Sequence, residues 1–237
     1  MSLEQFQKII TTCQPYDDIA LTLGGFGDPL AHPQIMDFLT AAHESGIFAL
    51  NIETDGRHLD DALADKLLNS PLDTLSVFLD ADSEDLYRQV KGQTGFNDLT
   101  ARLEAFAAAS RKNNGPQLIP HLVKTRATMA EMERFYDRWL TTCNAAVITG
   151  YNDFAAQIPD LSVMNMCPPQ RFPCRSLWRT LTILADGTTT ICPQDFKAAH
   201  PIANAFETTL EQLWNSDQLN QLRQNHLNNN YNHPLCT

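Results

Sequence analysis

"GGFGDPLAHP", residues 24–33, joins the short apolar segment IALTL at residues 19–23 to a helix-like segment at residues 34–46. Glycine adopts backbone conformations that other residues avoid, and it leaves N–H and C=O groups open to a close-lying ligand. A helix that begins directly after such a turn favours a negatively charged group at its N-terminus. The stretch therefore indicates a strand that ends at a binding rim, although glycines and Asp-Gly pairs also form ordinary strand-to-helix turns.

Hydrophobic periodicity alternates between strand and helix on either side of this turn. We expect an α/β fold with strands at 18–23, 47–53, 72–81, 117–123 and 145–150 and helices between them. Before the helix that lies between the last two of these strands, Thr128 and Glu131 have the spacing of a capping box. Alternation of this kind predicts a parallel sheet with right-handed crossovers, whose ligands lie at the carboxyl ends of the strands.

The regular pattern ends near residue 150, and we place a domain boundary near residue 160. Residues 161–237 begin with an irregular segment rich in proline and cysteine, and Asp186-Gly187 then lies between two short strand-like runs. This arrangement predicts a β-hairpin, which the helix-like residues 208–216 follow. The expected domains are therefore residues 1–160 and residues 161–237.

Composition excludes several classes of function. The net charge is −11 and no cluster of lysine or arginine is present, which argues against a nucleic-acid partner. The sequence holds no run of about 18 apolar residues and no signal-peptide pattern, so we expect a cytoplasmic protein without a membrane partner.

Four of the six cysteines lie in the second predicted domain, at Cys167, Cys174, Cys192 and Cys236. Cys13 and Cys143 are expected to be buried free thiols. Spaced cysteines in a chain without a secretion signal indicate zinc or an iron–sulfur cluster, because both require thiolate ligands. The spacing alone leaves iron–sulfur, zinc and unliganded thiols open.

Taken in order, these motifs resemble the radical S-adenosylmethionine (SAM) enzymes that carry a C-terminal SPASM or twitch extension. Residues 25–33 resemble the Gly-Gly-Glu-Pro motif of that family, TDGRHL at 54–59 its Thr-Asn-Gly element, and residues 76–92 its fourth-strand region. Cys174, Gly187 and Cys192 resemble the opening of the SPASM cysteine pattern. The resemblance implies a partial (βα)6 barrel that lacks its first strand, followed by a truncated SPASM/twitch-like domain with a β-hairpin and a helix.

The resemblance also implies the binding residues. The methionyl part of SAM would contact Gly24, Gly25, Gly27 and Asp28, with Thr54 and Asp80 as further candidates on neighbouring strand ends. A [4Fe-4S] auxiliary cluster would bind Cys167, Cys174 and Cys192. Cys236 would be its fourth ligand or the first ligand of a second cluster. Asp195 matches an acid common in the family, and the other interpretation is that it forms hydrogen bonds with its own turn. No catalytic residue is assigned.

Relatives carry a Cys-x3-Cys-x2-Cys segment before the glycine motif, whereas the 23 residues before Gly24 contain one cysteine. We therefore expect a piece of a longer protein, a remnant, or a subunit that obtains its catalytic cluster elsewhere. The resemblance implies that the intact enzyme is an oxidoreductase or maturase that uses SAM to generate a 5′-deoxyadenosyl radical for peptide or protein modification. This chain alone is expected to be inactive.

Two alternatives come from other classes of function. One is a non-catalytic module that binds a peptide or a partner chain, and the other is a structural domain that zinc holds together through its cysteines. A barrel that begins at its second strand also exposes an unpaired edge, so self-association is expected.

Overall fold

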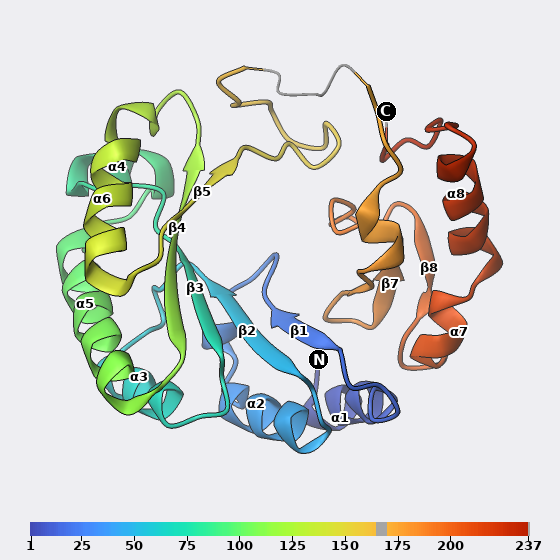
Figure 1. Ribbon diagram of the computed structural model, residues 1–237, viewed down its shortest axis with the longest axis horizontal. Helices are drawn as coiled ribbons and strands as arrows, with labels where there is room; N and C mark the ends of the chain where they lie inside the picture. The colour runs from blue at the N-terminus through green and yellow to red at the C-terminus, as the bar shows by residue number, and fades with distance from the viewer. Residues whose placement is uncertain (165–169, 237) are drawn as a thin grey trace. The chain divides into compact units, whose positions relative to one another are not determined.

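The computed structural model describes residues 1–164 and 170–236 (Figure 1), so Cys167 lies outside the described residues. The chain divides into two compact units. The larger contains Gln14–Tyr151 and Leu161–Val163, and the smaller contains Met1–Cys13, Asn152–Asp160 and Met164–Thr237. Each unit is described by itself.

A five-stranded parallel sheet is the centre of the larger unit. Its spatial order follows the sequence: β1 (Ala20–Leu23), β2 (Ala49–Thr54), β3 (Thr74–Phe78), β4 (Gln117–Lys124) and β5 (Val147–Gly150). Leu23 pairs with Ile52, Thr54 with Val77, and Lys124 with Gly150, so all five carboxyl ends lie at one rim. The expected α/β fold with a parallel sheet is confirmed.

Helices cover the convex face of this curved sheet (Figure 1). Leu39, Leu103 and Trp139 are completely buried, each on the apolar face of a different helix. One helix was not expected: a short segment that begins with the cap Ser83 and ends at Gly92, which has a left-handed conformation. The larger unit contains the 3-10 turns η1 (Pro29–Ala31) and η2 (Met129–Glu131) and the helices α2 (Ile35–Glu44), α3 (Asp61–Leu68), α4 (Glu84–Lys91), α5 (Phe96–Asn113) and α6 (Met132–Cys143).

The expected capping box before α6 is wrong. The Thr128 hydroxyl makes no cap hydrogen bond, because it donates to the Val123 carbonyl at 2.7 Å and accepts from the Thr125 N–H at 2.8 Å. The Glu131 carboxylate accepts from the Asp82 N–H at 2.7 Å and from the Ser83 hydroxyl at 2.5 Å. Thr128 therefore holds the end of β4 and Glu131 the start of α4, and neither side chain caps α6.

The smaller unit contains the expected hairpin within a three-stranded antiparallel sheet, β6 (Thr182–Ile183), β7 (Thr188–Thr190) and β8 (Pro201–Asn204). Gly187 turns the hairpin at φ +85°, and a Cβ there would come 2.4 Å from the Asn204 side chain. The 3-10 turn η3 (Arg175–Trp178) precedes the sheet, and the helices α7 (Leu210–Trp214) and α8 (Asp217–Leu227) follow it.

The N-terminal helix α1 (Leu3–Thr11) belongs to this smaller unit. Ile9 is buried with Ala205 and Leu213, and the Lys8 ammonium donates to the Phe206 carbonyl. Sequence periodicity places no such link between the two ends of the chain. The division at residue 160 remains a proposal about independently folding domains.

We predict that the edge of β1 supports self-association. Among the described residues, β1 pairs with β2 on one side and with no strand on the other, and an unpaired edge offers N–H and C=O groups to another chain. Sedimentation velocity should therefore show dimers or larger species that dissociate on dilution. A monomer throughout the micromolar range would contradict this prediction.

Candidate functional site

The glycine turn after β1 has a backbone shape that requires its glycines. Gly25 and Gly27 have φ angles of +95° and +106°, a region that side chains disfavour, and a Cβ at either would meet no atom within 4 Å. Gly24 differs, because a Cβ there would lie 2.6 Å from the Cβ of Glu53. The turn thus packs tightly against β2 at Gly24 and then opens at Gly25 and Gly27.

Asp28 ends the turn and ties it to the neighbouring strand. One carboxylate oxygen accepts from the Leu30 N–H at 2.9 Å and caps η1. Both carboxylate oxygens lie 2.8 Å from the hydroxyl of Thr54, the last residue of β2, and that hydroxyl accepts from the Gly56 N–H at 2.9 Å. Thr54 is 4% exposed. The sequence-predicted residues Asp28 and Thr54 are therefore in direct contact.

The surroundings shift the pKa values of the acids at this strand end in opposite directions. Burial raises the pKa of Asp28, and the nearby Asp55 carboxylate raises it further against the opposing hydrogen bonds from Leu30 and Thr54. Burial acts on Asp55 in the same direction, but its bonds to Arg57 and Asp28 outweigh that effect and lower its pKa. Burial also raises the pKa of Glu53. Of these three carboxyl groups, Asp55 is therefore the one whose ionised form its surroundings stabilise, through Arg57 and Asp28.

Asp80 lies on the same rim but is held by protein partners. It follows β3 at φ +57°, and its carboxylate accepts from the Val123 N–H at 2.7 Å and pairs with Lys91. These contacts join β3, β4 and α4. The structure thus brings Gly24, Asp28 and Thr54 together and places Asp80 at the next strand end, where it fixes the backbone.

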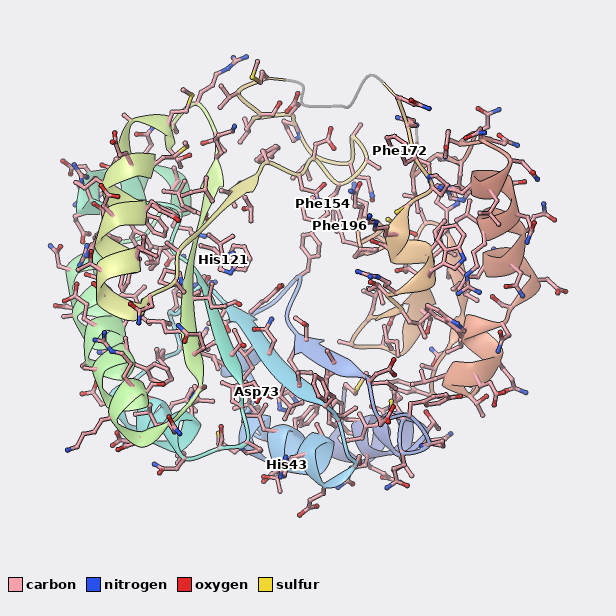
Figure 2. The ribbon with its side chains drawn as sticks, viewed as in Figure 1. His43, Asp73, His121, Phe154, Phe172 and Phe196 are labelled. Atoms are coloured by element: carbon pink, nitrogen blue, oxygen red, sulfur yellow. The ribbon has the colours of Figure 1, made fainter. Side chains whose placement is uncertain are left out.

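A further feature of the sheet is the side chain of His121, on β4. Figure 2 shows it directed from β4 toward the concave face of the sheet, where its ring stacks on Phe78 with centroids 4.5 Å apart. Both ring nitrogens are buried without a hydrogen-bond partner among the described residues. Burial lowers the pKa of His121, although Asp80 opposes this shift, so the ring is neutral at pH 7. Strand alternation places it on that face, but no local signal shows its lack of partners.

The cysteine site lies in the smaller unit. Cys174 precedes η3, Cys192 follows β7 and Cys236 lies in the tail after α8, and all three are free thiols. Burial raises the pKa of Cys236, and the charges of Cys192 and Cys174 raise it further. All three cysteines belong to the smaller unit, and their chemistry suits iron–sulfur or zinc ligation. Within residues 1–164 and 170–236, no set of three donors is already arranged as a metal site.

Two buried side chains organise the surroundings of these cysteines. Asp195 is 1% exposed and accepts from the N–H groups of Ala199 and His200 at 2.9 and 2.8 Å, as expected if it stabilises its own turn. His226 is 2% exposed, and its Nδ1 accepts from the Cys174 N–H at 3.2 Å. Its Nε2 lies 3.5 Å from the Cys236 sulfur. Sequence reasoning did not find His226, which is 52 residues from Cys174 along the chain.

Residues 1–138 match the family model of the radical SAM superfamily. The chain belongs to this superfamily. Residues 174–237 match the SPASM model, an iron–sulfur cluster-binding domain. The resemblance to radical SAM proteins with a C-terminal SPASM domain is thereby confirmed.

Curated relatives include an uncharacterized protein of Treponema pallidum, 26% identical over 84% of this chain and 58% of the relative. A cofactor-modifying protein of tungsten-containing aldehyde ferredoxin oxidoreductase from Pyrococcus furiosus is 30% identical over 34% of this chain and 22% of its own length. This radical SAM chain thus spans less than two thirds of either relative.

Solved structures share the fold at low sequence identity. SuiB of Streptococcus suis, bound to the precursor peptide SuiA, has a TM-score of 0.76 at 15% identity and covers 94% of this chain and 60% of its own. The protein anSMEcpe with bound AdoMet has a TM-score of 0.67 at 12% identity and covers 95% of this chain and 75% of its own. BtrN in complex with AdoMet and 2-DOIA has a TM-score of 0.63 at 14% identity, over 100% of this chain and 78% of its own. No helix in the described part of this radical SAM chain has the length and apolar character to cross a bilayer.

We predict that Thr54→Val destabilises the rim, because it removes the donor to Asp28 and the acceptor for Gly56 while keeping the shape of the side chain. A buried polar group left without its partner costs about 1–3 kcal/mol, and urea denaturation should show a loss of that size. Exchange of the Gly56 amide should accelerate as well.

Thr22→Val is the matched control, since Thr22 is exposed on β1 and has one long contact, 3.5 Å from the Asn51 amide. It should change the free energy of unfolding by less than about 0.5 kcal/mol. Equal losses of unfolding free energy in the two variants would show that the hydrogen bonds of Thr54 do not stabilise the rim.

Proposed function

We propose that this chain forms the SAM-binding and auxiliary-cluster parts of a radical SAM enzyme that modifies a peptide or a protein. The observation that carries the proposal is the glycine turn at the carboxyl end of β1. There, Gly25 and Gly27 combine positive φ angles with open space, in a chain of this superfamily. Backbone groups in that conformation can lie against a ligand without a side chain between them.

SAM would lie against the backbone of Gly25 and Gly27, with Gly24 closing the turn onto β2. The part of Asp28 in this proposal is positional, because its carboxylate already accepts from Leu30 and Thr54. With a reduced [4Fe-4S] cluster as the electron donor, SAM bound here would supply a 5′-deoxyadenosyl radical that takes a hydrogen atom from the substrate. Thr54 and Asp80 would keep the rim in shape through their bonds to Asp28 and Val123.

The auxiliary [4Fe-4S] cluster would bind Cys174, Cys192 and Cys236, with Cys167 as the remaining thiolate. The free state of the first three thiols and the contacts of His226 with Cys174 and Cys236 support this assignment, as does the match of residues 174–237 to the SPASM model. Thiolate donors suit iron and zinc alike, so metal content decides between a cluster and a structural zinc ion.

A peptide or protein substrate is proposed from the likeness to SuiB, which is bound to a precursor peptide in its structure. Fold likeness alone does not transfer a substrate, so this part of the proposal depends on experiment. We further propose that these 237 residues alone do not cleave SAM, because they contain no Cys-x3-Cys-x2-Cys sequence. A cytoplasmic location is proposed with this chemistry, since iron–sulfur clusters and free thiols persist in reducing compartments.

We predict that Gly27→Ala weakens SAM binding. Alanine at φ +106° strains the backbone by about 1 kcal/mol, so the free turn should relax to another shape. Regaining the original shape on binding would then lower the affinity for SAM roughly fivefold. Isothermal calorimetry with SAM measures the difference. Gly46→Ala is the control, because Gly46 at the end of α2 has φ +80° and equal open space but lies outside the proposed site. Equal affinity in the three proteins would contradict SAM binding at this turn.

We also predict that the chain, reconstituted anaerobically with iron and sulfide, holds about four iron atoms and absorbs broadly near 400 nm. It should release no 5′-deoxyadenosine from SAM and dithionite. Iron, sulfide and zinc are measured per chain, and the nucleoside by chromatography. Zinc alone would leave the cysteine domain as a structural site, and 5′-deoxyadenosine from the purified chain would overturn its proposed inactivity.

A further inference from the structure

His226 connects two of the proposed cluster ligands. It lies in the last turn of α8 and is 2% exposed, with one ring nitrogen at the Cys174 backbone and the other at the Cys236 sulfur. Asn229 at φ +57° turns the chain after α8, and Arg171 donates to the Cys236 carbonyl. The tail therefore returns to His226 and places Cys236 beside it.

The contact with Cys174 fixes the tautomer of the ring. A backbone N–H can only donate, so Nδ1 must present its lone pair to the Cys174 N–H at 3.2 Å. In a neutral imidazole the proton then resides on Nε2, which faces the Cys236 sulfur at 3.5 Å. A thiolate accepts hydrogen bonds and donates none. The polarity of the second contact is therefore Nε2–H to sulfur.

The same geometry argues against His226 as a metal ligand. A histidine that binds a metal normally donates an N–H from its other ring nitrogen, which fixes the ring. Here the other nitrogen accepts from the Cys174 N–H, so coordination through Nε2 would leave the ring without any proton. Imidazole in that state is not expected at neutral pH, and the cluster ligands must be the thiolates.

We propose that His226 is a positioning residue that holds the Cys174 backbone through Nδ1 and donates Nε2–H to the Cys236 thiolate, making the auxiliary cluster easier to reduce. The inference rests on the cluster named under the proposed function. Hydrogen bonds to cluster sulfurs stabilise the more negative, reduced state and so raise the reduction potential. Edge contact with the Tyr231 ring, at 5.0 Å between centroids, keeps the imidazole in place.

Two amide variants separate the two contacts. In His226→Asn the side-chain oxygen replaces Nδ1 and can accept from Cys174, but no donor reaches Cys236. In His226→Gln the amide N–H replaces Nε2 and can donate to Cys236. His226→Leu removes both contacts, and His200→Leu is the control, because His200 is a neighbouring histidine whose ring contact is with His233.

Each protein is reconstituted with iron and sulfide, its iron content is measured, and its midpoint potential is determined by dithionite titration followed by electron paramagnetic resonance. We expect the wild-type, Gln and His200→Leu proteins to share one potential and the Asn and Leu proteins to have a more negative one. Iron content should fall most in His226→Leu. If only His226→Leu loses its iron, the midpoint potentials of His226→Asn and His226→Gln decide whether the hydrogen bond to Cys236 raises the potential.

Equal potentials in the Asn, Gln and wild-type proteins, all loaded with iron, would overturn the inference while the cluster proposal stands. If the wild-type protein takes up no iron, the cluster proposal fails and the tuning role fails with it. Nitrogen-15 spectra of the metal-free protein labelled at histidine test the tautomer separately. A proton on Nδ1 of His226 at pH 7 would overturn the assigned geometry.

Discussion

The hydrogen bonds between Asp28 and Thr54 hold the rim together, because they join the glycine turn after β1 to the end of β2. In the same turn Gly24 packs against Glu53, and Gly25 and Gly27 present open backbone. Asp80 and Glu131 fix the next strand end in the same way through Val123 and Asp82. Acidic side chains at this rim thus mainly accept hydrogen bonds from the protein itself. The open main-chain groups of Gly25 and Gly27 are left for a ligand.

The smaller unit uses buried polar side chains for a comparable purpose. Asp195 holds the loop after Cys192 through two backbone N–H groups, and Arg223 holds η3 by donating to the Leu177 carbonyl at 2.8 Å. His226 adds a contact to both Cys174 and Cys236. A cluster that needs thiolates from distant parts of the sequence requires such supports, because short irregular segments bury little apolar surface of their own.

Local patterns were sufficient for the strands, the hairpin at Gly187 and the glycine turn, since alternation and turn chemistry depend on neighbouring residues. They failed where a side chain bonds far along the chain. Glu131 has the spacing of a capping box, yet it bonds Ser83, 48 positions away. Helix α4 has only eight residues and buries only Leu86 and Tyr87, so few apolar positions mark it in the sequence. In the candidate site, Asp28 and Thr54 lie at neighbouring strand ends and are in contact, whereas His226 became visible only in three dimensions.

The packing of α1 with the C-terminal residues has a consequence during synthesis. Ile9 is buried against Leu213, 204 residues later in the chain. At about 5–20 residues per second, a ribosome needs roughly 10–40 s to supply that partner. For this interval the apolar face of α1 has no native surface to cover it, while the intervening parallel sheet can already form. The larger unit is in this sense an insertion in the smaller one, and a chaperone that binds amphipathic helices would find a target in α1 until Leu213 has been synthesised.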